Sequence, residues 1–488
     1  MRRPGAPTVR QWVWLVGVAC VWYWWRRINM DVTPTQTVPV DLLEYLRWTK
    51  ALALAHKAQY EAGGTVVQPL VLLMGNEAGD LDSAASAIAL SYVMNHEQAY
   101  FMRTYGVPAG VYVPVLQTAR RALSQRQENL HVYEHVQVPV DALLCVDELG
   151  DTSSPVWAPS AQVALGLVDH PRLRVGWGTD RHVVVVVDHH EDEGLYQDAP
   201  LRIIRSPSTS PVGSASSLIA ALAQQARHGA PLDGRLADLL LSAIVLDTRN
   251  LKMLEEGGKG TRADVEAYAY LVQSASVSSA AQDQVHLAAR TVTWSRELQR
   301  IKDQVGHLDT NGLLERDLKE VQVSTTQRML HVGLASVPVS LSAWLSGAYQ
   351  MSTPLGEVTA EVQEQEWSRW WASLGAFMDE RHWDMAVVLS AYKAETKSRR
   401  DLALALRGTP AELASLSQAL GDASLGLEKW KGERRTENGK KERLGGLDAE
   451  GRVRAVPGLV GAVWRQGNTA ANRKVVQPAL VRALQRVL

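Results

Sequence analysis

Apolar runs that stop at an acidic side chain recur in the first half of the chain and constrain its fold more than any other feature. The run Val163–Val168 ends at Asp169, and the unbroken valines Val183–Val187 end at Asp188. Such β-branched runs are typical of strands in a parallel sheet that is buried on both faces. Helical stretches such as Ser83–Asn95 provide the crossovers that parallel strands require. The pattern predicts an α/β domain.

Three further apolar stretches and one long helical stretch extend this prediction. The additional strand candidates are Val66–Met74, Val111–Leu116 and Ala142–Val146. The Leu- and Ala-rich stretch Arg235–Leu246 is long enough for a helix, and this helix delivers Asp247 at its end.

Polar side chains follow the predicted strands and this helix. Open α/β sheets bind ligands beyond the carboxyl ends of their strands, so we expect these side chains to share one cleft. Carboxylates collected in one cleft repel one another unless divalent cations neutralise them. The sequence therefore predicts a two-metal hydrolase, with these candidate ligands: Asp80, Asp82, Asp169, His189 and Asp247.

The second part of the chain has a different texture. After a polar helical segment, Val285–Val305, the stretches at 321–341 and 383–392 predict strands. Ser340–Gly347 and Glu361–Arg381 predict helices between and around them. We therefore expect a second, smaller α/β domain.

These patterns divide the chain into successive parts. We expect a metal-binding domain over residues 30–275, a helical linker over 276–300 and a substrate-binding domain over 301–488. Within the last, the charged, glycine-rich stretch 428–454 predicts a solvated insertion loop; the alternative is a surface that guides a polyanion.

Composition excludes several classes of protein. The net charge of -1 gives no overall field that would favour nucleic acid or an anionic membrane surface. Two cysteines, Cys20 and Cys145, make no disulfide framework, which favours a reducing, cytoplasmic setting.

The first 29 residues need a separate interpretation. Their apolar run, Trp12–Trp25, has basic flanks. As a helix it would cover about 21 Å, which is shorter than the roughly 30 Å hydrocarbon core of a bilayer. An artefactual or disordered extension, a membrane anchor and a targeting segment remain the alternatives, and we expect membrane association only in the anchor case.

Several separated strings carry a family resemblance. GNEAGDLDS, LVDH, VDHH, PVGSASSL and LDTRN resemble the DHH phosphoesterase superfamily, and in particular its exopolyphosphatase branch. That branch shares its two-domain plan with family II inorganic pyrophosphatases and prune-type proteins. The similarity continues to the C-terminus through LSQRQENL, LLERDLK and NRKVVQP. It implies a DHH domain with a parallel sheet, followed by a DHHA2 domain.

The resemblance also implies a metal site. It places Asp80 and Asp169 on a first ion, with Asn76 near it, and Asp169 on both ions. It places the second ion among four side chains: Asp82, Asp169, His189 and Asp247. Asn76 stands where family II pyrophosphatases have a histidine. Because an amide oxygen is a harder ligand than an imidazole nitrogen, Mg²⁺ is favoured, with Mn²⁺ or Co²⁺ as alternatives.

The same resemblance implies the reaction and the residues that bind substrate. Two ions lower the pKa of a shared water, so no side-chain nucleophile is required. Asp169 and His190 are the implied catalytic residues, and Asp188 orients a histidine or the strand-end loop. The implied phosphate ligands are His190, Lys319, Arg473 and Lys474, with Arg126 and Arg400 as further candidates.

The function that follows is an exopolyphosphatase, which releases terminal orthophosphate from linear inorganic polyphosphate. An inorganic diphosphatase, or a hydrolase of short polyphosphates or nucleoside polyphosphates, is the enzymatic alternative. A prune-like scaffold is the non-enzymatic alternative. The sequence indicates no particular oligomeric state.

Some motifs carry less weight. His131 and His135 have the spacing of a helical metal pair, but we expect surface histidines. Ser83 is expected to cap a helix, and Ser214 and Ser216 to be structural or to contact phosphate. Asp147 aligns outside the metal set. The remaining family match, K-x-T-x-x-D, has no assigned role and comprises Lys259, Thr261 and Asp264.

Overall fold

The computed structural model describes residues 37–64, 68–276, 284–345, 360–394, 397–430, 433–435, 441–443, 452–453 and 456–488. The chain forms two compact units, and each contains more than one segment. The first unit comprises Met1–Gly75, Asp82–Leu116 and His135–Leu287; the second comprises Asn76–Leu81, Gln117–Glu134 and Ala288–Leu488. The predicted N-terminal extension, residues 1–29, lies outside the described residues.

The first unit is built on the predicted parallel sheet. Its strand order is β2-β1-β3-β4-β5, and all neighbours are parallel. The strands are β1 (Leu70–Met74), β2 (Val111–Val115), β3 (Val163–Val168), β4 (Val183–Asp188) and β5 (Leu201–Ile204). Every residue of the first four is buried, as expected for valine- and leucine-rich strands covered on both faces.

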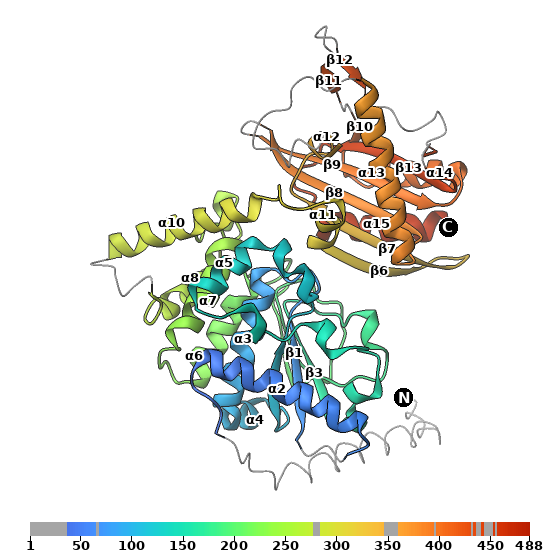
Figure 1. Ribbon diagram of the computed structural model, residues 1–488. Helices are drawn as coiled ribbons and strands as arrows, with labels where there is room; N and C mark the ends of the chain where they lie inside the picture. The colour runs from blue at the N-terminus through green and yellow to red at the C-terminus, as the bar shows by residue number, and fades with distance from the viewer. Residues whose placement is uncertain are drawn as a thin grey trace, which may run out of the picture. The chain divides into compact units, whose positions relative to one another are not determined.

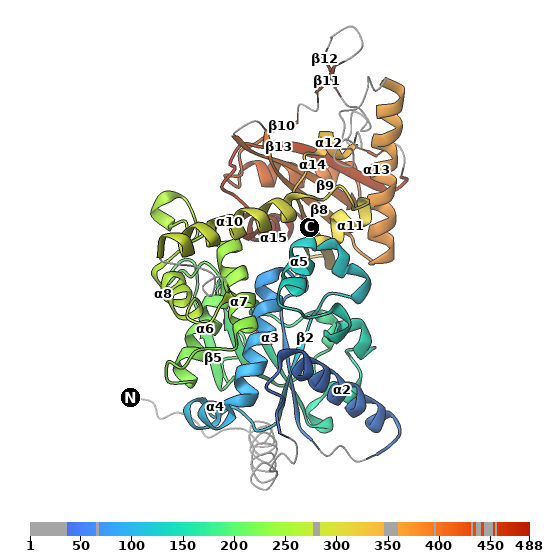
Figure 2. The same ribbon diagram turned by 60° about the vertical axis from the view of Figure 1, so that its left-hand side comes forward.

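Helices surround this sheet, as Figures 1 and 2 show. They are α2 (Leu42–Glu61), α3 (Leu81–His96), α4 (Gln98–Tyr105), α6 (Ala215–Ala226), α7 (Gly234–Asp247) and α8 (Arg262–Leu271). Helix α5 (Gln127–His135) follows the 3₁₀ turn η1 (Arg120–Gln125). The predicted helix Ser83–Asn95 lies within α3. The predicted helix Arg235–Leu246 is confirmed as α7, and Asp247 is its last residue.

One strand prediction was wrong, and one strand of this sheet was not predicted. Ala142–Val146 is not a strand: it makes one parallel bridge, Leu116 to Cys145, between the 3₁₀ turns η2 (Val140–Ala142) and η3 (Val146–Leu149). The Glu148 carboxylate accepts the Cys145 N–H at 2.9 Å. This local bond stabilises a turn, whereas in a strand the same N–H would donate to a neighbouring strand. Strand β5 was not predicted because its short sequence, LRII, has no apolar run and is only half-buried.

The second unit contains a six-stranded mixed sheet of order β10-β13-β9-β8-β7-β6, in which only β7 and β8 are parallel neighbours. The strands are β6 (Leu318–Ser324), β7 (Met329–Val337), β8 (Met385–Ala394), β9 (Lys397–Arg407), β10 (Leu427–Lys429) and β13 (Leu459–Gln466). Its helices are α10 (Gln284–Asp303), α11 (Thr310–Arg316), α12 (Leu341–Leu345), α13 (Ala360–Glu380), α14 (Pro410–Gly421) and α15 (Arg473–Val487).

Two apolar layers cover this sheet. On one face α13 contributes Trp367, Trp370 and Trp371, and the rings of Trp367 and Trp370 stack at 5.4 Å between centroids. On the other face α14 and α15 pack their leucines and alanines. The chain has 16 Trp and 2 Phe, and tryptophan is the main aromatic filler of the first layer. The predicted combination of a parallel-sheet α/β domain and a C-terminal α/β domain is confirmed.

Part of the predicted insertion loop has regular structure. Within 428–454, β11 (Glu433–Arg435) and β12 (Lys441–Arg443) pair as an antiparallel hairpin. Across the described ranges no helix combines the length and the apolar character that a membrane span requires. The predicted anchor segment Trp12–Trp25 lies outside those ranges.

Candidate metal centre

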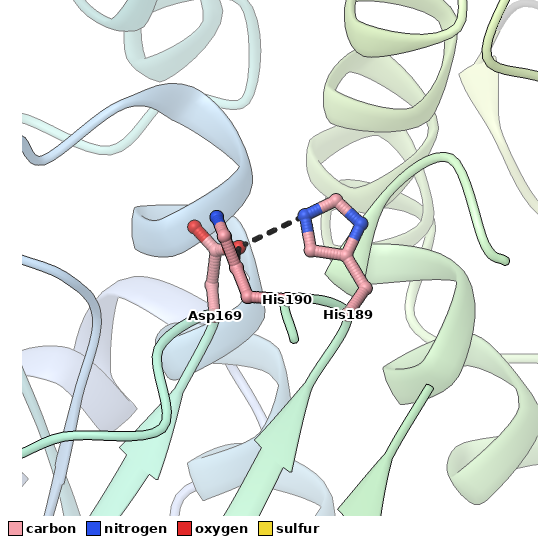
Figure 3. Close-up of side chains that lie close together, drawn as sticks. All are labelled: Asp169, His189 and His190. Atoms are coloured by element: carbon pink, nitrogen blue, oxygen red, sulfur yellow. Dashed lines mark ion pairs between the residues drawn. The ribbon is translucent and has the colours of Figure 1, made fainter. Parts of the chain in front are cut away.

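The site begins where two neighbouring strands end. Asp169 directly follows β3, and Asp188, the last residue of β4, precedes His189 and His190. The two ends are joined because the Asp169 N–H donates to the Val187 carbonyl at 2.9 Å. Ligand atoms of Asp169, His189 and His190 all lie within 4.8 Å of one another (Figure 3). The structure therefore brings together three of the predicted site residues.

The backbone of Asp169 is unusual. Its φ is +63°, in the left-handed region that non-glycine residues rarely adopt. The Asp169 carboxylate is buried, and the Ser83 hydroxyl donates to its Oδ2 at 2.5 Å. The sequence predicted that Ser83 caps a helix. It lies instead within the first turn of α3, where its hydroxyl holds Asp169. Strained backbone of this kind concentrates at functional sites.

His189 is oriented for metal binding. Its Nδ1 lies 2.9 Å from the Val212 carbonyl oxygen, which only accepts, so Nδ1 carries the proton. Its Nε2 therefore presents a lone pair, 3.2 Å from Asp169 Oδ1 and 4.0 Å from Asp82 Oδ2. A histidine whose second nitrogen donates to a carbonyl is the arrangement found at protein metal sites.

Asp188 contacts both histidines. One oxygen, Oδ1, accepts the backbone N–H of His189 at 2.8 Å and lies 2.8 Å from His190 Nδ1. Burial raises the pKa of Asp188, but the hydrogen bond and charge of His190, with smaller contributions from His189 and His170, outweigh it and lower the pKa to about 2. Asp188 is thus ionised and fixes the His190 ring.

Asp82 lies at the N-terminus of a second helix. Its buried carboxylate accepts the backbone N–H groups of Ala215 at 2.7 Å and Ser216 at 2.8 Å, at the start of α6. The hydroxyls of Ser214 and Ser216 donate to it at 2.7 and 2.6 Å. The two serines therefore hold a candidate metal ligand.

The other predicted metal ligands lie on separate segments. Asp247 is half-buried at the end of α7 in the first unit. Asn76 and Asp80 lie in the loop between β1 and α3, which belongs to the second unit. There the Asn76 side-chain oxygen accepts the Gly79 N–H at 3.1 Å and tightens the loop.

In the second unit, two predicted phosphate ligands lie near one carboxylate. Arg473, the first residue of α15, donates to the Asp317 backbone oxygen at 2.7 Å and to its carboxylate at 2.8 Å. Burial raises the pKa of Asp317, but Arg473, Arg126 and Lys319 outweigh it and lower the pKa to about 2. Lys474 is exposed in the first turn of α15, where Asn472 accepts its N–H at 2.9 Å.

Arg126 and Arg400, also predicted as phosphate ligands, bond to the protein. The Nε of Arg400 donates to the Thr469 carbonyl at 2.8 Å. Arg126 is buried; its guanidinium donates to the carbonyls of Ala78, at 2.8 Å, and Arg316 and lies 3.4 Å from the Glu128 carboxylate.

Glu128 and Arg316 are site neighbours that the sequence analysis missed. Arg316 donates to both Glu128 oxygens at 3.1 Å, and neither residue is exposed. His131 and His135 contact different carboxylates, Glu297 and Asp238, so they form no metal pair.

Comparison with known proteins identifies the two domains. Residues 70–244 match the DHH family N-terminal domain, and residues 296–483 match the DHHA2 domain. The chain therefore contains a DHH family N-terminal domain and a DHHA2 domain. Its DHH domain carries β1 to β5 and most of α7, and its DHHA2 domain carries the second sheet.

Several curated relatives share part of their length with the chain. Exopolyphosphatase PRUNE1 of Rattus norvegicus is 29% identical over 303 residues, which is 62% of this chain and 58% of that protein. The Homo sapiens protein of the same name is 29% identical over 299 residues, 61% of this chain and 57% of that protein. A putative exopolyphosphatase of Schizosaccharomyces pombe is 25% identical over 185 residues, which is 38% of this chain and 42% of that protein. The chain thus spans a little over half the length of the PRUNE1 relatives.

Solved structures show more distant likeness. A putative family II inorganic pyrophosphatase of Methanococcus jannaschii is 18% identical, with a TM-score of 0.45, covering 85% of this chain and 99% of that one. An exopolyphosphatase-related protein from Bacteroides fragilis is 11% identical, with a TM-score of 0.34, and the match covers 88% of this chain and 96% of that one.

Proposed function

We propose that this DHH protein is a metal-dependent exopolyphosphatase that releases terminal orthophosphate from linear inorganic polyphosphate. The observation that carries the proposal is the cluster of Asp169, His189 and Asp82 at the carboxyl edge of the parallel sheet. The names of the PRUNE1 and Schizosaccharomyces pombe relatives support the substrate class.

The donor atoms fit divalent cations. His189 presents an unprotonated Nε2, and the Asp82 and Asp169 carboxylates are held by hydroxyl and N–H groups that leave their negative charge in place. Bound divalent ions would supply an activated water and neutralise the substrate phosphate. We propose two ions, held also by Asn76, Asp80 and Asp247. Because Asn76 offers an amide oxygen, we propose Mg²⁺ ahead of Mn²⁺ and Co²⁺.

His190 is suited to contact phosphate. Its Nδ1 lies 2.8 Å from Oδ1 of the ionised Asp188, which fixes the orientation of the ring. We propose that His190 binds the terminal phosphate and delivers a proton to the leaving oxygen.

The second unit provides cations for the phosphate chain. Arg473 donates two of its N–H groups to Asp317. A guanidinium has five N–H donors, so others can bind a phosphate oxygen. We propose Arg473, Lys319 and Lys474 as the principal phosphate ligands. Arg126 and Arg400 stay as weaker candidates because several of their donors already bind carbonyl groups.

Orthophosphate release from long-chain polyphosphate, tripolyphosphate and pyrophosphate tests the proposal, each with Mg²⁺ and with Mn²⁺. We expect the full chain to release phosphate fastest from polyphosphate with Mg²⁺. Equal or faster turnover of pyrophosphate would assign the chain to the diphosphatases. No hydrolysis of any of the three would support a scaffold.

A further inference from the structure

A buried carboxylate outside the metal cluster makes more hydrogen bonds than its own helix requires. Asp264, on the first turn of α8, has no exposed surface and accepts the backbone N–H and hydroxyl of Thr261 at 2.8 and 2.7 Å. These bonds complete a capping box. Asp264 also accepts the Gly213 N–H at 2.9 Å and the Ser217 hydroxyl at 2.6 Å. Two of its four donors thus come from a distant segment.

That segment, Val212–Ser217, comprises the loop that leads into α6 and the first residues of the helix. We call it the entry loop, and it contacts two candidate metal ligands. The Val212 carbonyl accepts the His189 Nδ1–H and so fixes which ring nitrogen faces Asp169. Further along the loop, N–H and hydroxyl groups bind the Asp82 carboxylate. Movement of the entry loop therefore changes the orientation of both ligands.

Gly213 shows how closely the loop lies against α8. A Cβ at this position would lie 2.6 Å from Thr248 Cγ2, 2.7 Å from the Lys259 carbonyl oxygen and 2.9 Å from Asp264 Oδ2. Only glycine fits without displacement of backbone or of the carboxylate. The close approach lets Asp264 receive the Gly213 N–H directly.

We propose that Asp264 is a positioning residue of the metal centre: it fixes the entry loop, and through the loop it orients His189 and Asp82. This gives the K-x-T-x-x-D match a role. The inference rests on the proposed function only in that His189 and Asp82 bind a divalent ion.

The principal test is Asp264→Asn in the full chain. An amide has one acceptor oxygen, and its NH₂ group would oppose the N–H of Gly213 or Thr261, so the entry loop should detach from α8. Loss of outer partners of metal ligands typically weakens metal binding about 10- to 100-fold. We expect Mn²⁺ affinity, measured by titration calorimetry without substrate, to fall by about tenfold or more.

Asp233→Asn is the matched control. Asp233 caps α7 in the same unit by accepting the N–H groups of Arg235 and Leu236, and it does not contact the entry loop. It should lower the thermal unfolding temperature while leaving Mn²⁺ affinity unchanged. If Asp264→Asn also lowered only the unfolding temperature, Asp264 would be a structural cap and the proposal would be wrong.

Two less disruptive variants test the proposal if Asp264→Asn does not fold. Ser217→Ala and Thr261→Ala each remove one hydroxyl from the same carboxylate, the first on the loop side and the second on the α8 side. Only Ser217→Ala should weaken Mn²⁺ binding. Equal metal affinities in the pair would overturn the proposal.

Ring ¹⁵N spectra of His189 separate this inference from the proposed function. In the metal-free wild type we expect the Nδ1–H tautomer, and in Asp264→Asn a mixture. If the wild type bound no Mn²⁺, the proposed metal site would fail, yet the spectra would still test the positioning. An unchanged tautomer in Asp264→Asn would contradict it.

Discussion

The two units hold carboxylates in opposite ways. In the first unit, hydroxyl and backbone N–H groups hold Asp82, and Ser83 holds Asp169. In the second unit, guanidinium groups hold Glu128 and Asp317. Neutral donors orient a carboxylate without cancelling its charge, whereas a guanidinium cancels it. The first arrangement therefore leaves a negative site, to which we assign the proposed divalent cations, and the second fixes cations in place, among them Arg473, to which we assign phosphate.

The largest expected effect comes from the negative site. Asp169→Asn removes charge from a carboxylate that we assign to both ions. Loss of several kcal/mol of electrostatic stabilisation corresponds to about 10³-fold or more in rate, so orthophosphate release from polyphosphate should fall by at least that factor.

Asp147→Asn is its control, because Asp147 is an exposed residue of η3 outside the cluster. It should cost less than about tenfold in the same assay, which corresponds to 1.4 kcal/mol. A larger loss in Asp147→Asn than in Asp169→Asn would show that the acids were assigned wrongly.

The next effect concerns stability in the second unit. Glu128→Gln leaves the Arg126 and Arg316 guanidinium groups buried without their counter-charge, and breaking a buried ion pair costs about 3–5 kcal/mol. Thermal unfolding at pH 7 should show a clear decrease in midpoint. Ser83→Ala, which removes a neutral donor from Asp169, should cost less.

The stability difference between wild type and Glu128→Gln should depend on pH. Burial raises the pKa of Glu128, but Arg316, Arg126 and Lys302 outweigh it and hold the pKa below the usual value of 4.5. Stability from the ionised carboxylate is therefore complete above pH 4.5 and is lost as the pH falls through the lower, folded-state pKa. The difference between wild type and Glu128→Gln should shrink in that acidic range. A constant difference would mean that the charge contributes nothing.

A smaller effect is expected at the phosphate-binding cations. Arg473→Lys loses the fork that binds Asp317 with two N–H groups. Hydrogen bonds to charged groups contribute about 1.5–3 kcal/mol, so KM for polyphosphate should rise by about tenfold or more while kcat changes little. Arg486→Lys, exposed at the far end of α15, is the matched control. An equal KM change in both would remove Arg473 from the substrate site.

The smallest expected effect is a change of metal preference. Asn76→His supplies an imidazole nitrogen, which favours Mn²⁺ or Co²⁺ over Mg²⁺ more than an amide oxygen does. Initial rates titrated with each metal should show relative activity moving towards Mn²⁺ and Co²⁺. An unchanged preference would show that residue 76 does not contact an ion.

Local patterns account for much of the fold. The valine runs predicted β3 and β4 because a buried parallel strand needs continuous apolar residues, and the Leu-rich run predicted α7 with Asp247 at its end. The prediction of a strand at Ala142–Val146 was wrong because a local side-chain bond from Glu148, which apolar patterning does not reveal, stabilises a turn.

The site is harder to predict from the sequence because its contacts join residues that are far apart in the chain. Arg126 meets Arg316 after 190 residues, and Asp264 meets Gly213 after 51. Spacing reveals neither pair, whereas Asp169 and His189 were predicted to come together because they follow neighbouring strands. The roles of the site residues stay predictions.

A titration of Mn²⁺ into the metal-free full chain, in the absence of phosphate, tests the contrast between the two units most directly. We predict two ions bound by the wild type and by Arg473→Lys, and a strong loss of binding in Asp169→Asn. Failure of the wild type to bind Mn²⁺, or an equal loss in both variants, would contradict the assignment of the negative cluster to metal and of the cationic cluster to phosphate.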